Sequence, residues 1–128
     1  MTATRKNLES ALTGECQAHF RYLFFSELAA RLGRDDIAQI FRETAQQEAT
    51  HAKMHLRLLY PELTIEDALK IAIEAETQEY AKIYPDFEKT AGEELEKESD
   101  EKVRKTISEA KKFFSIFSRA EKVHAERY

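Results

Sequence analysis

Glycine, proline and cysteine are all scarce, with three, two and one among 128 residues. So few turn-forming residues leave little material for β-hairpins. The single cysteine, Cys16, excludes an intrachain disulfide and a Cys-x-x-Cys metal site, and it fits a reducing compartment. No apolar run reaches about 18 residues, and Met1 is not followed by an apolar signal segment. We therefore expect a cytoplasmic protein without a membrane partner.

An excess of basic charge is also missing, since 24 acidic residues stand against 20 basic ones. No strongly basic face is implied, and we expect no nucleic-acid partner. What the chain has is long stretches in which apolar and charged residues alternate with a period of three to four. This pattern is typical of amphipathic helices, and the length suits one core. The sequence predicts one all-α domain over residues 1–128.

Four helices are predicted, in two hairpins that span residues 4–60 and 65–128. The first helix runs from about Thr4–Leu32, where a glycine follows, and Asp35 is expected to N-cap the second helix. The second helix ends before Pro61 because proline cannot continue a helix without losing a hydrogen bond.

The second hairpin begins at a capping box made by Thr64 and Asp67. Pro85 is expected to kink the third helix without ending it. The polar segment 92–100 is interpreted as a turn, and Ser99 is expected to cap the fourth helix. We expect the aromatic residues of these helices to form core: Phe20, Tyr22, Phe24, Phe25, Phe113, Phe114 and Phe117.

Two Glu-x-x-His sequences, Glu48–His51 and Glu121–His124, lie on the second helix of each hairpin. Residues three apart share a helix face, so each pair can reach one point beside its helix. A glutamate on the apolar stripe of the preceding helix, Glu15 or Glu76, accompanies each pair. An isolated buried carboxylate is very costly, and few basic residues share these stripes. A pair of divalent cations would neutralise them; the alternative is solvated Glu–His pairs on helix surfaces.

The surrounding sequence resembles the rubrerythrin family over essentially the whole chain. The matching segments are Gly14–Ala18, Arg21–Tyr22, Glu48–Lys53, Ala75–Glu79, Tyr84–Pro85 and Glu121–Tyr128. The resemblance implies a ferritin-like four-helix bundle, in which two helices each supply one glutamate and two supply Glu-x-x-His to a two-metal site. An additional glutamate at Glu79, one turn after Glu76, is a rubrerythrin feature that ferritins lack.

The metal ligands implied by this resemblance are Glu15, Glu48, His51, Glu76, Glu79, Glu121 and His124. They would hold two iron ions, although zinc, manganese or mixed occupancy suits the same ligand types. Glu48 and Glu121 would bridge the ions, while His51 and Glu79 would alternate on one ion with its redox state. Tyr22 and Tyr84 match family tyrosines that hydrogen-bond ligand carboxylates. We expect Glu79, His51 and these two tyrosines to act in catalysis.

The implied function is that of a di-iron oxidoreductase, a peroxidase that reduces hydrogen peroxide to water under oxidative stress. No counterpart of the family's rubredoxin domain lies in these residues, so a separate rubredoxin-like protein is expected to donate the electrons. Ferroxidase activity in iron handling is an alternative function. A metal-binding structural dimer without catalysis is another.

The link between the hairpins is short. In a ferritin-like bundle the second and third helices run parallel, so their link must return the length of the bundle. The predicted helix ends lie about 30 Å apart, while residues 61–64 reach about 14 Å fully extended. We therefore expect a domain-swapped homodimer, as in rubrerythrins with similarly short links. Each site would take Glu15, Glu48 and His51 from one chain and the other ligands from its partner.

Three residues near the ligands are given structural roles. Cys16 is expected to be a small packed core residue. His19 lies four residues after Glu15 and is interpreted as a core histidine or a support for a ligand. His55 is interpreted as solvated.

Overall fold

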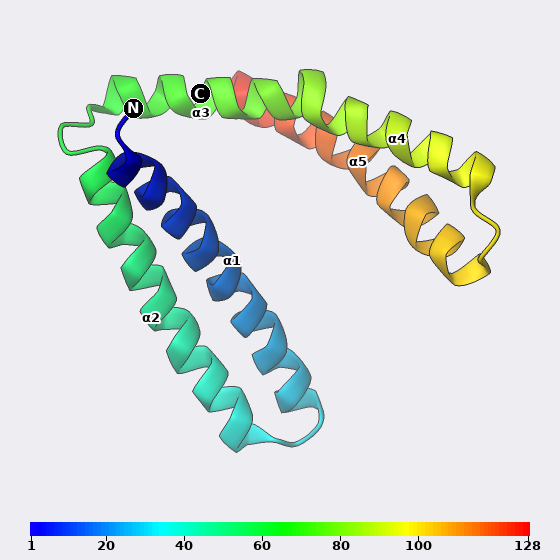
Figure 1. The fold of residues 1–128 in the computed structure, drawn as a ribbon, viewed down its shortest axis with the longest axis horizontal. Coiled ribbons are helices and arrows are strands. Elements are labelled where there is room, and N and C mark those ends of the chain that lie inside the picture. Colours follow the sequence, from blue (N-terminus) through cyan, green and yellow to red (C-terminus); the bar gives the residue numbers. More distant parts are fainter. The chain divides into compact units, whose positions relative to one another are not determined.

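The computed structural model describes residues 1–128, and nearly all of them are helical (Figure 1). The helices of residues 1–62 are α1 (Ala3–Arg31) and α2 (Asp35–Leu59). Those of residues 63–128 are α3 (Ile65–Gln78), the π-helix η1 (Glu79–Ile83), α4 (Tyr84–Lys97) and α5 (Glu101–Arg127). Since α3, η1 and α4 follow one another directly, the chain has four long helices, and the all-α prediction is confirmed. That the two hairpins form one domain stays a prediction.

Capping and one glycine set the ends of the first hairpin. The Thr2 hydroxyl accepts a hydrogen bond from the Arg5 N–H at 3.1 Å and starts α1. Gly33 has a φ of 73°, which glycine adopts without steric cost, and lets the chain turn into α2. The predicted cap at Asp35 is wrong, because Asp35 is already helical and Arg34 stands at the N-cap. As a first-turn acid, Asp35 still complements the positive end of the helix dipole.

A row of buried residues, most of them alanine, packs α2 against α1. Ala38, Ala45, Ala52 and Leu59, seven residues apart, are all buried along one face of α2. A seven-residue spacing keeps one narrow face of a helix against its neighbour. Alanine at three of these positions lets the two helices approach closely.

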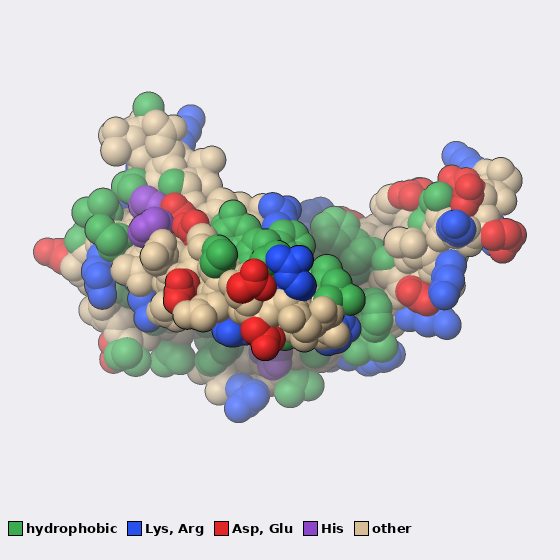
Figure 2. All heavy atoms as spheres, turned by 90° about the horizontal axis from the view of Figure 1, so that it is seen from below, with side chains coloured by type: hydrophobic (Ala, Val, Ile, Leu, Met, Phe, Trp, Pro, Cys, Tyr) green, Lys and Arg blue, Asp and Glu red, His purple; other side chains and the backbone are tan.

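Much of the aromatic stripe lies outside this row. Phe20, Phe24 and Phe113 are 69%, 62% and 52% exposed, so the expectation that they are core residues is wrong for this single chain. A two-helix contact buries one face of each helix and leaves the others open. Figure 2 shows apolar side chains at the surface among the charged ones. None of the helices has the length and apolar character needed to cross a membrane.

The π-helix η1 has a clear chemical cause at Pro85, which has no N–H to donate. The Tyr84 N–H bonds to the Glu79 carbonyl, five residues back, and the Tyr80 carbonyl thereby loses its helical donor. The Ser118 hydroxyl of α5 donates to that Tyr80 carbonyl at 2.9 Å. Ser118 therefore stabilises the wide turn that follows α3, and Pro85 leaves the helix continuous, as predicted.

Replacing Ser118 with alanine should lower the free energy of unfolding by about 1 kcal/mol, because the half-buried Tyr80 carbonyl loses its donor. Ser115, three residues earlier on α5, makes no such bond and is the matched control. Urea unfolding of Ser118→Ala and Ser115→Ala measures the difference. Equal stability of the two variants would mean that Ser118 does not support η1.

The predicted turn at residues 92–100 is wrong over most of its length. Helix α4 continues to Lys97, since the segment after Gly92 is rich in glutamate, leucine and lysine, which favour helix enough to offset one glycine. Asp100, not Ser99, caps α5, and its carboxylate accepts from the Lys102 N–H at 2.9 Å. The Arg104 guanidinium donates to carbonyls at the end of α4, including that of Glu98 at 2.8 Å.

Candidate metal centre

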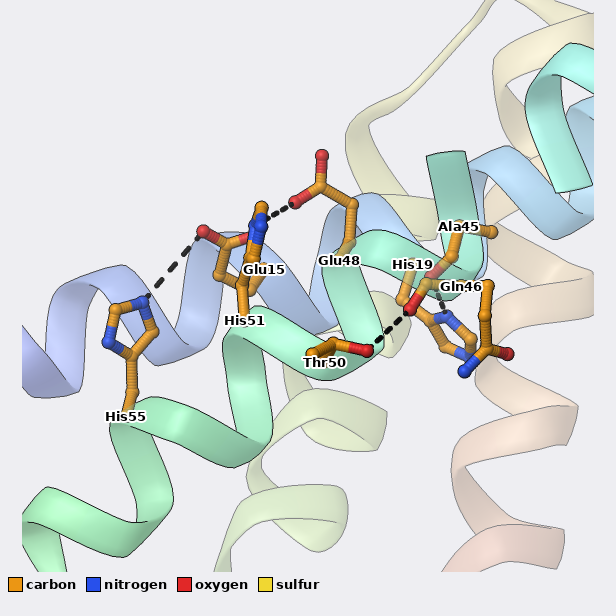
Figure 3. Close-up of polar contacts among 8 residues, drawn as sticks. All are labelled: Glu15, His19, Ala45, Gln46, Glu48, Thr50, His51 and His55. Carbon is orange, nitrogen blue, oxygen red and sulfur yellow. Dashed lines mark hydrogen bonds and ion pairs between the residues drawn. The ribbon is translucent and has the colours of Figure 1, made fainter. Parts of the chain in front are cut away.

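The first hairpin brings together Glu15 of α1 with Glu48 and His51 of α2, which we call the first group (Figure 3). Each residue offers one ligand atom, and these atoms all lie within 4.8 Å of one another. His51 Nδ1 is 3.1 Å from a Glu48 oxygen and 3.5 Å from a Glu15 oxygen. The three-residue spacing on α2 puts Glu48 and His51 on the face that meets α1.

The second hairpin repeats this arrangement with Glu76 of α3 and Glu121 and His124 of α5, which we call the second group. His124 Nδ1 is 3.2 Å from a Glu121 oxygen and 3.6 Å from Glu76 Oε2. Glu76 Oε2 is buried and makes no hydrogen bond. A buried oxygen without a partner is costly, so this atom is suited to a ligand that the protein itself does not supply.

In each group the pKa of one carboxyl is raised by the other, as expected for two acids that share a proton. A hydrogen bond to Glu15, together with burial, raises the pKa of Glu48, and the same bond lowers the pKa of Glu15. The neighbouring carboxyl of Glu76, again with burial, raises the pKa of Glu121. A proton between two carboxylates stands where a divalent cation would neutralise both. Carboxylate and imidazole donors together suit iron, zinc or manganese, so both groups fit a metal site.

The metal-free protein should lose stability as the pH rises above 4.5, the ordinary pKa of glutamate. Because the folded state holds the protons of Glu48 and Glu121 more tightly than the unfolded state does, their contribution is complete below 4.5. It is lost as the pH rises through their raised pKa values. The lowered pKa of Glu15 acts in the opposite sense, below 4.5.

Thermal unfolding in a chelator, compared with the Glu48→Gln/Glu121→Gln double variant, isolates this effect. The variant is permanently neutral at both positions, so its melting temperature should exceed that of the wild type increasingly as the pH rises from 4.5 to 7. A difference that stays constant over this range would contradict the proton sharing.

Glu79 lies outside the second group, as the first residue of η1 one turn after Glu76. Its charge raises the pKa of Glu121 and also that of Tyr84. Burial is the largest cause of the raised pKa of Tyr84, which keeps its hydroxyl protonated and able to donate. The Tyr84 ring stacks on Phe114, with centroids 6.0 Å apart.

Tyr22, the matching tyrosine of the first hairpin, packs against Phe41 at 5.8 Å and Phe25 at 6.4 Å. No hydrogen bond joins it to Glu15 or Glu48, so its proposed contact with a ligand carboxylate stays a prediction.

The remaining residues near the first group differ partly from expectation. His19 Nδ1 lies 2.6 Å from the Ala45 carbonyl, which ties α1 to α2 as a structural histidine would. Cys16 is exposed, so its predicted packing is wrong; one residue after Glu15, it lies about 100° further around α1. His55 is not solvated but faces Glu15, 3.8 Å from one of its oxygens. His55 lies seven residues after Glu48 and so on the ligand face of α2, and this spacing could have predicted its position near the first group.

Comparison with known proteins gives a consistent result. The family model described as rubrerythrin matches residues 6–110. A rubrerythrin of Clostridium perfringens is 32% identical over 99% of this chain and 68% of its own length. Rubrerythrin-1 of Clostridium acetobutylicum is 34% identical with the same coverage, and a rubrerythrin of Porphyromonas gingivalis is 38% identical over 74% of this chain and 54% of its own.

The chain thus spans about two thirds of the length of the two clostridial relatives. Their alignments run over 144 and 145 positions against 128 residues here, so each has at least 16 positions without a counterpart in this chain. The family model covers the first group and Glu76, and the two clostridial alignments, which span 99% of the chain, extend over Glu121 and His124 as well. The chain belongs to the rubrerythrin family.

Proposed function

We propose that this protein reduces hydrogen peroxide to water at a di-iron site, with electrons from a rubredoxin-like donor, as a cytoplasmic defence against oxidative stress. Membership of a family of ferritin-like di-iron oxidoreductases supports this proposal. The observation that carries it is the pair of matching groups, with Glu79 one turn from the second. Two ferrous ions would supply the two electrons that cleave the O–O bond, and two protons complete the two waters.

The residues divide into constant and exchanging ligands. Glu15, Glu48, Glu76, Glu121 and His124 would hold the two ions in both redox states. Glu79 and His51 would serve as alternative ligands, one for each redox state. An additional carboxylate favours the more highly charged oxidised pair, whereas a neutral imidazole favours the reduced pair. The unpartnered Glu76 Oε2 supports the ligand role of that residue.

Tyrosine hydroxyls serve the site as hydrogen-bond donors. The raised pKa of Tyr84 keeps its proton in place beside Glu79, Glu121 and Glu76, whose charges contribute to that shift. In this proposal the Tyr84 hydroxyl orients a ligand carboxylate, and Tyr22 does the same from the first hairpin.

We further propose that each site is built by two chains in a swapped homodimer. Helix α2 continues eight residues beyond His51 to Leu59, and α3 starts at Ile65, eleven residues before Glu76. In a ferritin-like bundle these helical segments would add to about 28 Å along the axis. The link 60–64 spans at most about 20 Å.

Exposed aromatic side chains give a second line of support. Phe20 and Phe24 of α1, and Phe113 and Phe117 of α5, keep between 43% and 69% of their surface exposed within this chain. Large apolar surface of this kind commonly marks an interface with another protein surface. A bundle completed by a partner's hairpin would cover it.

Stopped-flow mixing of the diferrous protein with hydrogen peroxide, and separately with oxygen, tests the activity. We expect oxidation by peroxide to be much faster than oxidation by oxygen. Faster oxidation by oxygen would indicate a ferroxidase, and no reaction with either oxidant would indicate a structural metal site. Addition of reduced rubredoxin should then restore the ferrous state over repeated turnovers.

A further inference from the structure

A second histidine reaches the first group from the next turn of α2. His55 lies four residues after His51 and seven after Glu48, and its Nε2 is 3.8 Å from Glu15 Oε1 (Figure 3). Residues at these spacings share one face of a helix. The His55 and Glu15 side chains keep only 25% and 23% of their surface exposed, so the two side chains meet where α1 and α2 pack together.

The two oxygens of Glu15 face different imidazoles. His51 Nδ1 is 3.5 Å from Oε2, whereas His55 Nε2 faces Oε1. Only His51 belongs to the first group, whose ligand atoms lie within 4.8 Å of one another. Figure 3 shows the His55 ring on the side of Glu15 away from Glu48. His55 is therefore placed to hold the carboxylate rather than to bind the metal between the group's members.

The second hairpin has no equivalent. Glu76 is the counterpart of Glu15, and the residue four after His124 is Tyr128, which is 54% exposed. The buried Glu76 Oε2 makes no hydrogen bond. A histidine behind the terminal glutamate is thus a property of the first hairpin alone.

We propose that His55 is a positioning residue, which donates its Nε2–H to Glu15 Oε1 and leaves Oε2 free for the metal. This inference rests on the metal site of the proposed function. The present 3.8 Å exceeds the usual range for such a hydrogen bond by about 0.6–1 Å, which a small rotation of either side chain supplies. Hydrogen bonds behind a ligand fix its orientation and typically change metal affinity by about 10–100-fold.

Cobalt(II) titration of the full-length, metal-free protein tests this role through visible absorption. His55→Leu should lower the affinity for one of the two cobalt ions per chain about 10–100-fold. His55→Gln keeps an N–H donor and should restore most of that affinity, with the wild-type band shape. Met54→Leu, at the exposed neighbouring position, is the matched control and should bind as the wild type does. Thermal unfolding of the metal-free variants identifies any general loss of fold.

Two outcomes would overturn the proposal. Wild-type affinity in His55→Leu would show that His55 does not act on Glu15. A loss in His55→Gln as large as in His55→Leu, with an altered cobalt spectrum, would make His55 a direct ligand instead. Either result leaves two cobalt ions bound to the wild type and the proposed function standing. Failure of the wild type itself to bind two ions would instead refute that function.

Discussion

Glu121→Gln should reduce both affinity for the metal pair and the rate of peroxide reduction by more than about 100-fold, because residues behind a ligand already contribute about 10–100-fold. It should at the same time raise the melting temperature of the metal-free protein at pH 7. The raised pKa of Glu121 shows that its charged form is disfavoured beside Glu76, and glutamine removes that charge. Iron binding, peroxide kinetics and thermal unfolding in a chelator measure the three effects.

Glu126→Gln is the matched control, since Glu126 is exposed on the same helix, five residues further on. It removes the same charge and should leave all three measurements near their wild-type values. A ligand is distinguished from a residue that merely supports the fold because its replacement raises the melting temperature of the metal-free protein but weakens metal binding and activity. If Glu121→Gln weakened the metal-free protein and still bound two iron ions, its assignment as a ligand would be refuted.

Two inactive chains should restore activity when they are combined. Glu48→Gln disrupts the first group and Glu121→Gln disrupts the second, so neither variant alone contains a complete site. In a swapped heterodimer the intact first hairpin of one chain meets the intact second hairpin of the other. Random pairing makes half the dimers mixed, each with one good site of two, so co-expression should return about a quarter of wild-type activity.

The control pair is Glu48→Gln with His51→Ala, both of which alter the first group. No combination of these chains yields an intact first hairpin, so no activity should return in any arrangement. Lack of recovery in the Glu48→Gln and Glu121→Gln mixture, despite mixed dimers seen by mass spectrometry, would show that one chain closes its own site.

Local patterns were sufficient to predict the helices and the two groups. Periodicity located all four long helices, and the three-residue spacing of Glu48 and His51 put both on the face that meets α1. The capping box at Thr64 and Asp67 is present as predicted, with Asp67 N–H bonded to the Thr64 hydroxyl at 3.0 Å. These features depend on neighbours within one turn of helix, which a single sequence displays directly.

Features that depend on contacts between helices were missed. The π-helix after α3 precedes Pro85, and its Tyr80 carbonyl accepts from the Ser118 hydroxyl of another helix, 38 residues away. One local feature was missed as well, since helix α4 passes Gly92 because the helix-forming residues after it outweigh one glycine. His55 approaches Glu15 only once α2 lies against α1. His55 was interpreted as solvated although its spacing from Glu48 puts it on the ligand face of α2.

Mössbauer spectroscopy of ⁵⁷Fe-loaded protein tests the central claim, a two-iron site that reduces peroxide. Protein loaded without oxygen should hold two ferrous ions per chain, and one equivalent of hydrogen peroxide per iron pair should make both ferric. The two electrons lost by the pair equal the two that the peroxide takes up. A single iron per chain, or a pair that stays ferrous after peroxide, would contradict the account.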